Sequence, residues 1–232
     1  VISMLPDGNI LQKVYEQILP FGKVNSIFID CSTVDVESAQ IVAESAQKKQ
    51  ILTLDAPVSG GVIGAETGSL TFMVGGDEVA FKTALPLFEI MGQKAILCGE
   101  SGAGQVTKIC NNMILGISMI GVCEAFALAN KLNLSAQKMF DVVSTSSGHC
   151  WSLNTYCPVP GVGPHSPSDN NYKPGFSTEL MLKDLSLAQS AAMTASVSTP
   201  LGSHAKALYE DFAKTSGKGK DFSAILNYIK DL

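Results

Sequence analysis

The sequence predicts an α/β half followed by an all-helical half, and three observations support this prediction. Short apolar runs alternate with helix-like stretches up to about residue 98. After Gly104 the strand-like runs stop, and apolar residues recur with the 3.6-residue period of helices. Glycines at positions 99, 102 and 104 separate the two patterns. We therefore expect one domain over residues 1–102 and a second over residues 103–232.

The first domain should contain a partly parallel sheet covered by helices. Strands are expected at residues 1–5, 26–30, 51–55, 70–74 and 95–98. Helix-like stretches separate them, such as residues 35–48 and 77–91, and this alternation is typical of α/β folds. Pro86 predicts a break or a late start in the second of these helices, because proline lacks a backbone N–H.

The second domain should consist of helices and one long loop. Residues 105–131 fit a single long helix, and Ser135 can cap another at residues 135–144. Residues 146–175 are rich in Pro, Gly, Ser and Asn and should form a long ordered loop. Three more helices are expected, at residues 177–195, 201–215 and 222–232, with Asp221 capping the last.

Composition excludes several classes of function. The net charge is −5 and no basic stripe is present, so we expect no nucleic-acid partner. The apolar run at residues 113–129 contains Ser118 and Glu124, and it fits a buried helix better than a membrane span. The six cysteines form no CxxC pair, which favours a reduced intracellular compartment, and the three histidines lack metal-ligand spacing. A small-molecule partner without a metal is the simplest expectation.

A glycine-rich stretch, DAPVSGGVIGAETG at residues 55–68, follows an apolar strand. Ser59, Gly60 and Gly61 can turn there without a bulky side chain in the way. Successive backbone N–H groups in such a turn form a concavity that suits an anion such as a carboxylate. The alternative is a plain glycine turn between a strand and a helix.

Lys108 and Asn112 stand four residues apart near the start of the predicted long helix, so they share one face. The helix dipole is positive there, and partial burial beside it should lower the pKa of a lysine toward neutrality. Such an amine can exchange a proton with an alcohol or a carbonyl oxygen. The alternative is a solvated surface lysine, but its neighbours in sequence are mostly apolar.

Weaker candidates lie elsewhere in the chain. Lys183 and Asp184 interrupt an amphipathic helix, and their pattern alone indicates two exposed charges. Leu5 and Pro6 follow the first predicted strand, and Thr33 follows the second. The ends of parallel strands are where α/β sheets bind ligands.

Taken together, these stretches resemble the β-hydroxyacid dehydrogenase family. The matches are DxPVSGGxxxAxxG at residues 55–68, GxxGxGxxxKxxxN at residues 99–112 and KDLxLA at residues 183–188. They stand in the order and rough spacing of the family, and the resemblance covers essentially the whole chain. Residues 146–162 and 170–176 look like the branch that acts in valine catabolism, rather than relatives acting on tartronate semialdehyde or 6-phosphogluconate.

The resemblance implies a fold and an activity. The first domain would be the C-terminal part of a Rossmann-type NAD-binding domain, and the second a helical domain like that of 6-phosphogluconate dehydrogenase. The implied protein is an oxidoreductase that transfers a hydride from a hydroxy acid to NAD. The family's GxGxxG phosphate loop and the acidic residue after it are not found in the 232 residues. We therefore expect residues 1–232 alone to bind NAD poorly or not at all.

The resemblance also implies a role for each matching residue. Lys108 would be the general acid/base, and Asn112 would hold it and the substrate in register. Ser59, Gly60 and Gly61 would hold the substrate carboxylate. The residues implied to contact or support the cofactor are Leu5, Pro6, Asn9, Thr33, Phe176, Lys183 and Asp184.

Other readings of the sequence remain open. One is a relative that reduces a short semialdehyde, and another is a truncated or catalytically idle homologue that acts only as an oligomerising module. The apolar pattern of the helical half predicts a homodimer or a higher homo-oligomer. The resemblance implies the mitochondrial matrix for a eukaryotic source and the cytoplasm otherwise.

Overall fold

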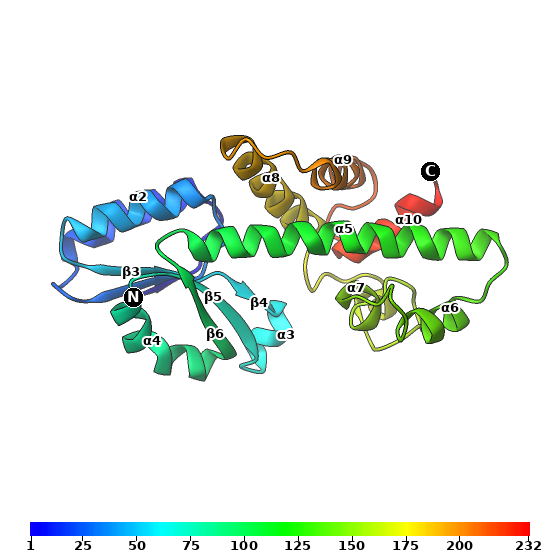
Figure 1. Cartoon of the computed structure of the whole chain (residues 1–232), viewed down its shortest axis with the longest axis horizontal. Coiled ribbons are helices and arrows are strands. Elements are labelled where there is room, and N and C mark those ends of the chain that lie inside the picture. The colour runs from blue at the N-terminus through cyan, green and yellow to red at the C-terminus, as the bar shows by residue number, and fades with distance from the viewer. The chain divides into compact units, whose positions relative to one another are not determined.

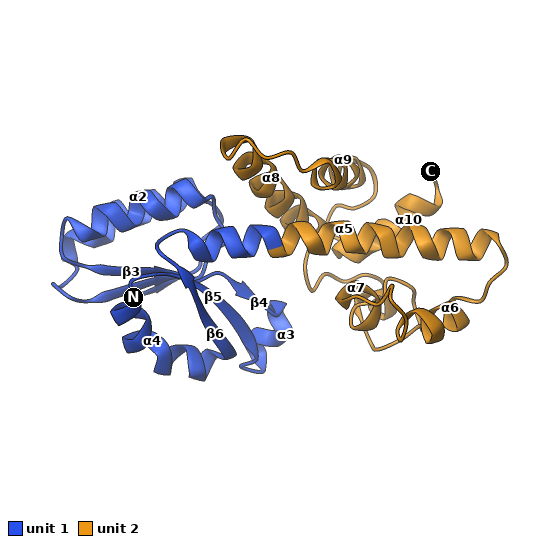
Figure 2. Cartoon of the chain, viewed as in Figure 1, with its two compact units in different colours: residues 1–110 blue, residues 111–232 orange.

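The computed structural model describes all 232 residues, which form two compact units, residues 1–110 and residues 111–232 (Figures 1 and 2). The division falls inside one long helix, α5 (Ala103–Lys131). The first turns of α5 therefore belong to unit 1, and the rest belongs to unit 2. Strands occur only before α5, as the sequence predicts.

Unit 1 is built on a mixed six-stranded sheet. Its strands are β1 (Ile2–Ser3), β2 (Ile27–Asp30), β3 (Leu52–Asp55), β4 (Val58–Ser59), β5 (Leu70–Gly76) and β6 (Gly92–Gly99). β1, β2 and β3 pair in parallel, so their carboxyl ends lie at the same edge. β5 runs antiparallel to β3 and β4 and parallel to β6.

Helices cover both faces of this sheet. They are α1 (Gly8–Ile18), α2 (Val36–Gln47), α3 (Gly61–Glu66) and α4 (Glu78–Met91), with a short 3₁₀ turn, η1 (Leu19–Phe21), after α1. Two neighbouring residues of β2 point to opposite faces of the sheet. Phe28 packs in one apolar cluster with residues of α1 and α2, whereas Ile29 packs in a second cluster with residues of α4. Side chains that alternate in this way give unit 1 its three layers (Figure 1).

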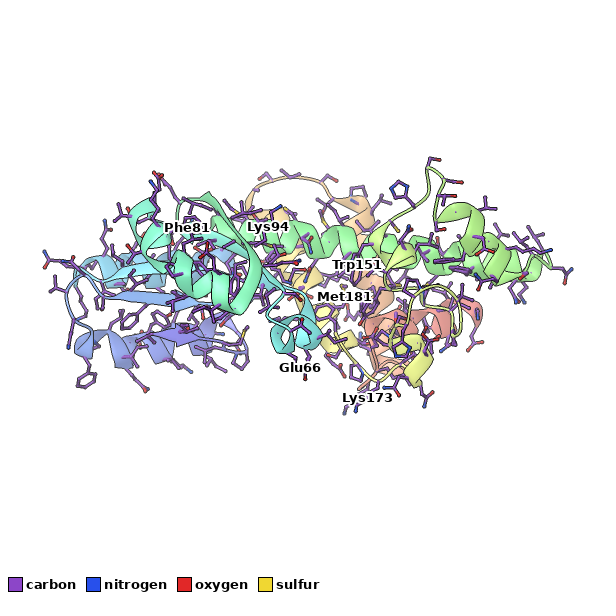
Figure 3. The ribbon with its side chains drawn as sticks, turned by 90° about the horizontal axis from the view of Figure 1, so that it is seen from below. Glu66, Phe81, Lys94, Trp151, Lys173 and Met181 are labelled. Carbon is purple, nitrogen blue, oxygen red and sulfur yellow. The ribbon has the colours of Figure 1, made fainter.

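Pro86 does not interrupt its helix, which corrects the break expected from the sequence. α4 runs unbroken from Glu78 to Met91 with Pro86 inside it. A proline removes one helical hydrogen bond. Packing of the buried Phe88 favours the helix despite that loss. Its ring centroid lies 4.8 Å from that of Phe72 on β5 and 6.1 Å from that of Phe81, which Figure 3 labels.

Unit 2 is helical throughout. After α5 come α6 (Ala136–Val143), α7 (Trp151–Asn154), η2 (Pro167–Asn170), α8 (Thr178–Thr194), α9 (Pro200–Thr215), η3 (Phe222–Ala224) and α10 (Ile225–Lys230). Its core includes Met119, Cys123 and Phe126 of α5 and Met181 of α8, all buried. α5 has the length and hydropathy of a membrane-spanning helix, and these buried side chains mark the face that packs in the core.

The long loop expected at residues 146–175 contains two short helices, α7 and η2, which corrects the sequence prediction. Local contacts explain both. The ring of Trp151 stacks on that of Tyr156 at 4.8 Å, and a capping box of Ser166 and Asp169 starts η2. The predicted cap at Asp221 is confirmed, because its carboxylate accepts from the N–H of Ser223. The Ser135 side chain makes no capping bond to α6.

Candidate active site

The loops after β1 and β2 are tied together at the carboxyl edge of the sheet. The N–H of Leu5 donates to Ser32 Oγ at 2.6 Å, and Ser32 Oγ donates to Asp30 Oδ1 at 2.7 Å. Two segments predicted to contact a cofactor, Leu5–Pro6 and Thr33, are therefore brought close together. Asn9 is exposed in the first turn of α1.

Asp30 is buried and bonds the residues at this edge of the sheet. Its Oδ1 also accepts from Ser3 Oγ at 2.7 Å, while Oδ2 is buried without a hydrogen-bond partner. Burial raises the pKa of the Asp30 carboxyl, against the opposing effect of its bonds to Ser32 and Ser3.

The predicted anion turn follows β4. Ser59 is half-buried at the end of that strand, and Gly60 and Gly61 are exposed. Gly60 has φ of 134° and Gly61 has φ of 63°, positive values that residues other than glycine rarely adopt. The backbone can therefore approach a small ligand closely at this turn.

Lys108 lies beside that turn and not in bulk solvent. Its side chain is 8% exposed, and Nζ donates to the carbonyl oxygen of Val58 at 2.7 Å. Val58 immediately precedes Ser59, so the amine and the predicted carboxylate turn are brought together. The alternative of a solvated surface lysine is wrong.

Asp55 fixes the start of the helix that carries Lys108. Its Oδ1 accepts from the N–H of Gly102 at 2.7 Å, and its Oδ2 accepts from that of Gln105 at 3.0 Å. The carboxylate thus satisfies free N–H groups at the N-terminus of α5. Burial raises the pKa of Asp55 to about 6, although these backbone bonds act in the opposite direction.

The glycines of the 99–104 motif allow the start of α5 to lie close against the sheet. Gly102 has φ of 91°. A Cβ on Gly104 would lie 2.4 Å from the carbonyl oxygen of Met73 and 2.6 Å from that of Asp55. Only glycine lets α5 start so close to β3 and β5.

Within unit 2, the predicted residues of α5 and α8 also meet. Asn112 Nδ2 donates to Asp184 Oδ2, and Asn111 Nδ2 donates to Asn112 Oδ1 at 2.9 Å. Asp184 is buried, which corrects the exposed charge that the pattern alone indicated. Lys183 Nζ lies 3.9 Å from Asp184 Oδ1, and the Lys183 side chain is 30% exposed.

Phe176 lies in the segment before α8. Its ring meets that of Phe222 edge-on at 5.7 Å, and its N–H donates to Asp221 Oδ2 at 3.1 Å. Tyr156 OH and the N–H of Gly175 donate to the same oxygen. A fully buried carboxylate therefore fixes the position of Phe176 within unit 2.

The residues at the sheet edge fit a dinucleotide better than a metal. No group of His, Cys, Asp and Glu side chains has an arrangement that could hold a metal ion. The linked loops after β1 and β2 occupy the edge where parallel α/β sheets bind nucleotides.

This geometry defines a class: an α/β unit of the nucleotide-binding type, with a buried lysine beside a glycine turn. Two family models match the chain. Residues 1–99 match the NAD binding domain of 6-phosphogluconate dehydrogenase, and residues 102–229 match the model described as NAD-binding of NADP-dependent 3-hydroxyisobutyrate dehydrogenase.

Similar proteins agree with these matches. The solved structure of 3-hydroxyisobutyrate dehydrogenase from Mycobacterium tuberculosis with L-serine is 48% identical, with a TM-score of 0.95, covering 99% of this chain and 78% of that one. The mitochondrial 3-hydroxyisobutyrate dehydrogenase of Mus musculus is 44% identical over 100% of this chain and 70% of its own length. An NAD-dependent L-serine dehydrogenase of Pseudomonas aeruginosa is 42% identical over 97% and 76%, respectively. The chain belongs to the 3-hydroxyisobutyrate dehydrogenase family, and the predicted Rossmann-type and helical architecture is confirmed.

The sequence pattern did not single out four residues that organise the site. Asp30, Ser32, Asp55 and Gln105 are polar and buried, and each bonds a backbone group or another polar side chain. The one signal in the sequence is position: Asp30 and Asp55 each end a strand, Ser32 follows a strand, and Gln105 lies in the first turn of a helix. Their partners are distant in sequence, so spacing alone could not identify the contacts.

Proposed function

We propose that the chain catalyses the NAD-dependent oxidation of 3-hydroxyisobutyrate to methylmalonate semialdehyde, a step of valine and other branched-chain amino acid catabolism. The observation that carries the proposal is the contact of Lys108 Nζ with the Val58 carbonyl, next to Ser59, Gly60 and Gly61. The contact supports the proposal because it brings the amine of Lys108 to the residue that precedes the glycine turn. The substrate is a short acid with a nearby hydroxyl group.

In this proposal the chain's own residues bind the acid and move one proton. The turn at Ser59, Gly60 and Gly61 holds the carboxylate, with its glycines permitting close approach. Neutral Lys108 accepts the hydroxyl proton at Nζ as the C–H bond breaks and the carbonyl forms. Bound NAD⁺ supplies the acceptor for the hydride. Burial of Lys108 keeps water from the amine.

The other predicted residues would hold the cofactor or the substrate. Leu5, Pro6, Asn9 and Thr33 would line the cofactor in unit 1. Phe176 and Lys183, both in unit 2, also remain predicted cofactor residues. Asn112 would bind substrate, and its bond with Asp184 would fix the facing sides of α5 and α8.

L-Serine is a second candidate substrate. A relative that is 42% identical is named NAD-dependent L-serine dehydrogenase, and the similar Mycobacterium tuberculosis enzyme was solved with L-serine. Serine and 3-hydroxyisobutyrate share a carboxylate and a 3-hydroxyl, and they differ by an amino group in place of a methyl. The proposed turn and lysine act on the shared groups, so both acids fit them. The comparisons do not favour a semialdehyde reductase or an idle homologue.

A side-by-side assay tests the proposal. In the complete enzyme, formation of the reduced cofactor at 340 nm would be followed with 3-hydroxyisobutyrate, L-serine and glycerate, each with NAD⁺ and with NADP⁺. We expect the highest kcat/KM with 3-hydroxyisobutyrate and NAD⁺. A preference for L-serine would establish the second candidate, and no turnover of any acid would contradict both.

Self-association and localisation complete the proposal. We propose a homodimer or a higher homo-oligomer, supported by exposed apolar side chains of unit 2: Ile114 and Leu128 on α5, Leu132 just after it, and Leu201 on α9. The mouse relative is named mitochondrial. The mitochondrial matrix follows for a eukaryotic source, and the cytoplasm follows for a bacterial one.

A further inference from the structure

Gln105 holds the backbone on both sides of Thr33. Its Oε1 accepts from the N–H of Val34 at 3.1 Å, and its Nε2 donates to the carbonyl oxygen of Ser32 at 2.9 Å. Thr33 is the residue between these two backbone groups. The Gln105 side chain is completely buried, although it comes from α5, more than seventy positions further along the chain.

The side-chain amide satisfies both bonds at neutral pH, which a charged group cannot do. The Val34 N–H needs an acceptor, and the Ser32 carbonyl needs a donor. An ionised carboxylate can only accept, and an ammonium group can only donate. Leaving either buried group without a partner costs about 1–3 kcal/mol. Position 105 therefore requires a side chain that both donates and accepts, and Gln105 does not merely fill space.

The same residue is fixed to the site by its backbone. The N–H of Gln105 donates to Asp55 Oδ2, and Gln105 stands one turn before Lys108 on α5. One residue thus connects the loop that carries Thr33 with the helix turn that carries Lys108.

We infer that Gln105 is a positioning residue that holds the Thr33 loop in the shape that binds the nicotinamide dinucleotide, in register with Lys108. The inference rests on the proposed function, because Thr33 is a cofactor contact only if the chain binds NAD. It predicts a defect in cofactor binding and no direct defect in binding of the hydroxy acid, whose turn at Ser59 has separate contacts.

The main test is made in the complete enzyme and compares Gln105→Glu with the unsubstituted protein by NADH fluorescence titration and by steady-state kinetics. At pH 8 the introduced carboxylate keeps the bond to Val34 but cannot donate to Ser32. We expect the Kd for NADH and the KM for NAD⁺ to rise about tenfold, as loss of one buried hydrogen bond implies. The KM for the hydroxy acid should change less than twofold, roughly the scale of a few tenths of a kcal/mol.

Acid should rescue this variant. A protonated carboxyl both donates and accepts, so it can restore both bonds. The carboxyl groups of Asp55 and Asp30 on the strands packed against this turn disfavour a further negative charge there. The ratio of NADH Kd values, variant over unsubstituted at each pH, should therefore fall as the pH is lowered from 8 to 6. A defect caused only by altered packing would leave the ratio constant.

Two further measurements separate this role from general destabilisation. Without cofactor, hydrogen exchange of the Val34 amide should be faster in Gln105→Ala and nearly unchanged in Gln105→Glu, which keeps the acceptor. The matched control is Gln12→Glu, because Gln12 Nε2 donates to Ser38 Oγ at 2.8 Å and joins α1 to α2. It should leave the Kd for NADH unchanged.

The outcomes distinguish the two proposals. If the unsubstituted protein oxidises a hydroxy acid with NAD⁺ but Gln105→Glu binds NADH equally well, the inference is overturned and the proposed function stands. If the unsubstituted protein neither binds NADH nor turns over, both are overturned.

Discussion

At the scale of single residues, buried carboxyl groups at the strand ends set the electrostatics of unit 1. Asp30 is the last residue of β2 and Asp55 is the last residue of β3, and burial raises the pKa of both. Each is held by short polar contacts, yet desolvation has the larger effect. Both groups therefore bind a proton more tightly in the folded chain than in the unfolded chain.

Asp55 makes this testable through the pH dependence of stability. Its pKa rises from 3.8 to about 6 on folding. An acid with a raised folded pKa contributes stability that is fully present below pH 3.8 and lost as the pH rises through 6. Such a shift amounts to about 3 kcal/mol. Asp55→Asn removes this contribution.

Urea unfolding of both proteins between pH 4 and pH 7 is the measurement. The unfolding free energy of the unsubstituted protein minus that of Asp55→Asn should fall with rising pH, by up to about 3 kcal/mol. A difference that stays constant or grows toward neutral pH would show that the carboxylate is favoured by the N-terminus of α5, against the desolvation argument.

At the scale of elements, α5 illustrates what spacing can and cannot predict. Its length follows from the 3.6-residue pattern, and the helix found, Ala103–Lys131, matches the expected 105–131 closely. The helix-breaking tendency of proline does not predict the continuous α4, because that tendency is local and the packing of Phe88 on Phe72 is not. The short strand β4 was missed because two residues carry too little pattern, and its pairing with β5 becomes visible only in space.

Two glycines on α5 provide a matched pair for a packing prediction. A Cβ at Gly104 would meet backbone oxygens that cannot move aside, whereas nothing lies within 4 Å of a Cβ at Gly121. Gly104→Ala should therefore lower the stability by about 1–3 kcal/mol, the usual cost of overpacking. Gly121→Ala should raise it by up to about 1 kcal/mol, because alanine is the better helix former.

Thermal unfolding of the two variants measures this difference. Activity provides a second readout, because a displaced first turn of α5 would move Lys108 while a change at Gly121 would not. Equal stability of the two variants would contradict the close seating of α5 on β3 and β5.

At the scale of the whole molecule, the family and the architecture could be predicted because three motifs occur in a fixed order. The contacts that assemble the site could not. Ser32 with Leu5, Asp55 with Gly102 and Gln105 with Val34 join residues 27 to 71 positions apart. Buried polar residues of this kind have no periodic pattern, so only the folded chain identifies their partners.

Self-association is the prediction at this scale. Leu128 of α5 and Leu132, just after its end, are 62% and 70% exposed. Burying such side chains between copies would be favourable by about 1.5–3 kcal/mol each. We expect the unsubstituted protein to sediment as a dimer or larger, and Leu128→Lys combined with Leu132→Lys to weaken the assembly.

Sedimentation equilibrium over a range of concentrations measures this. Ile90→Lys, which changes an exposed apolar residue of α4 in unit 1, is the control and should leave the mass unchanged. A monomer at every concentration of the unsubstituted protein would contradict the prediction.

The central claim is that Lys108 exchanges the proton during hydride transfer, and its substitution is the most direct test. In the complete enzyme, kcat for 3-hydroxyisobutyrate would be measured for Lys108→Ala and Lys108→Arg, with NADH binding followed in parallel. The account predicts a loss of kcat of about 10²–10⁴ in both variants with NADH affinity retained, because neither side chain can act as a base near neutral pH. Near-normal kcat in Lys108→Ala would contradict it and remove Lys108 from the mechanism.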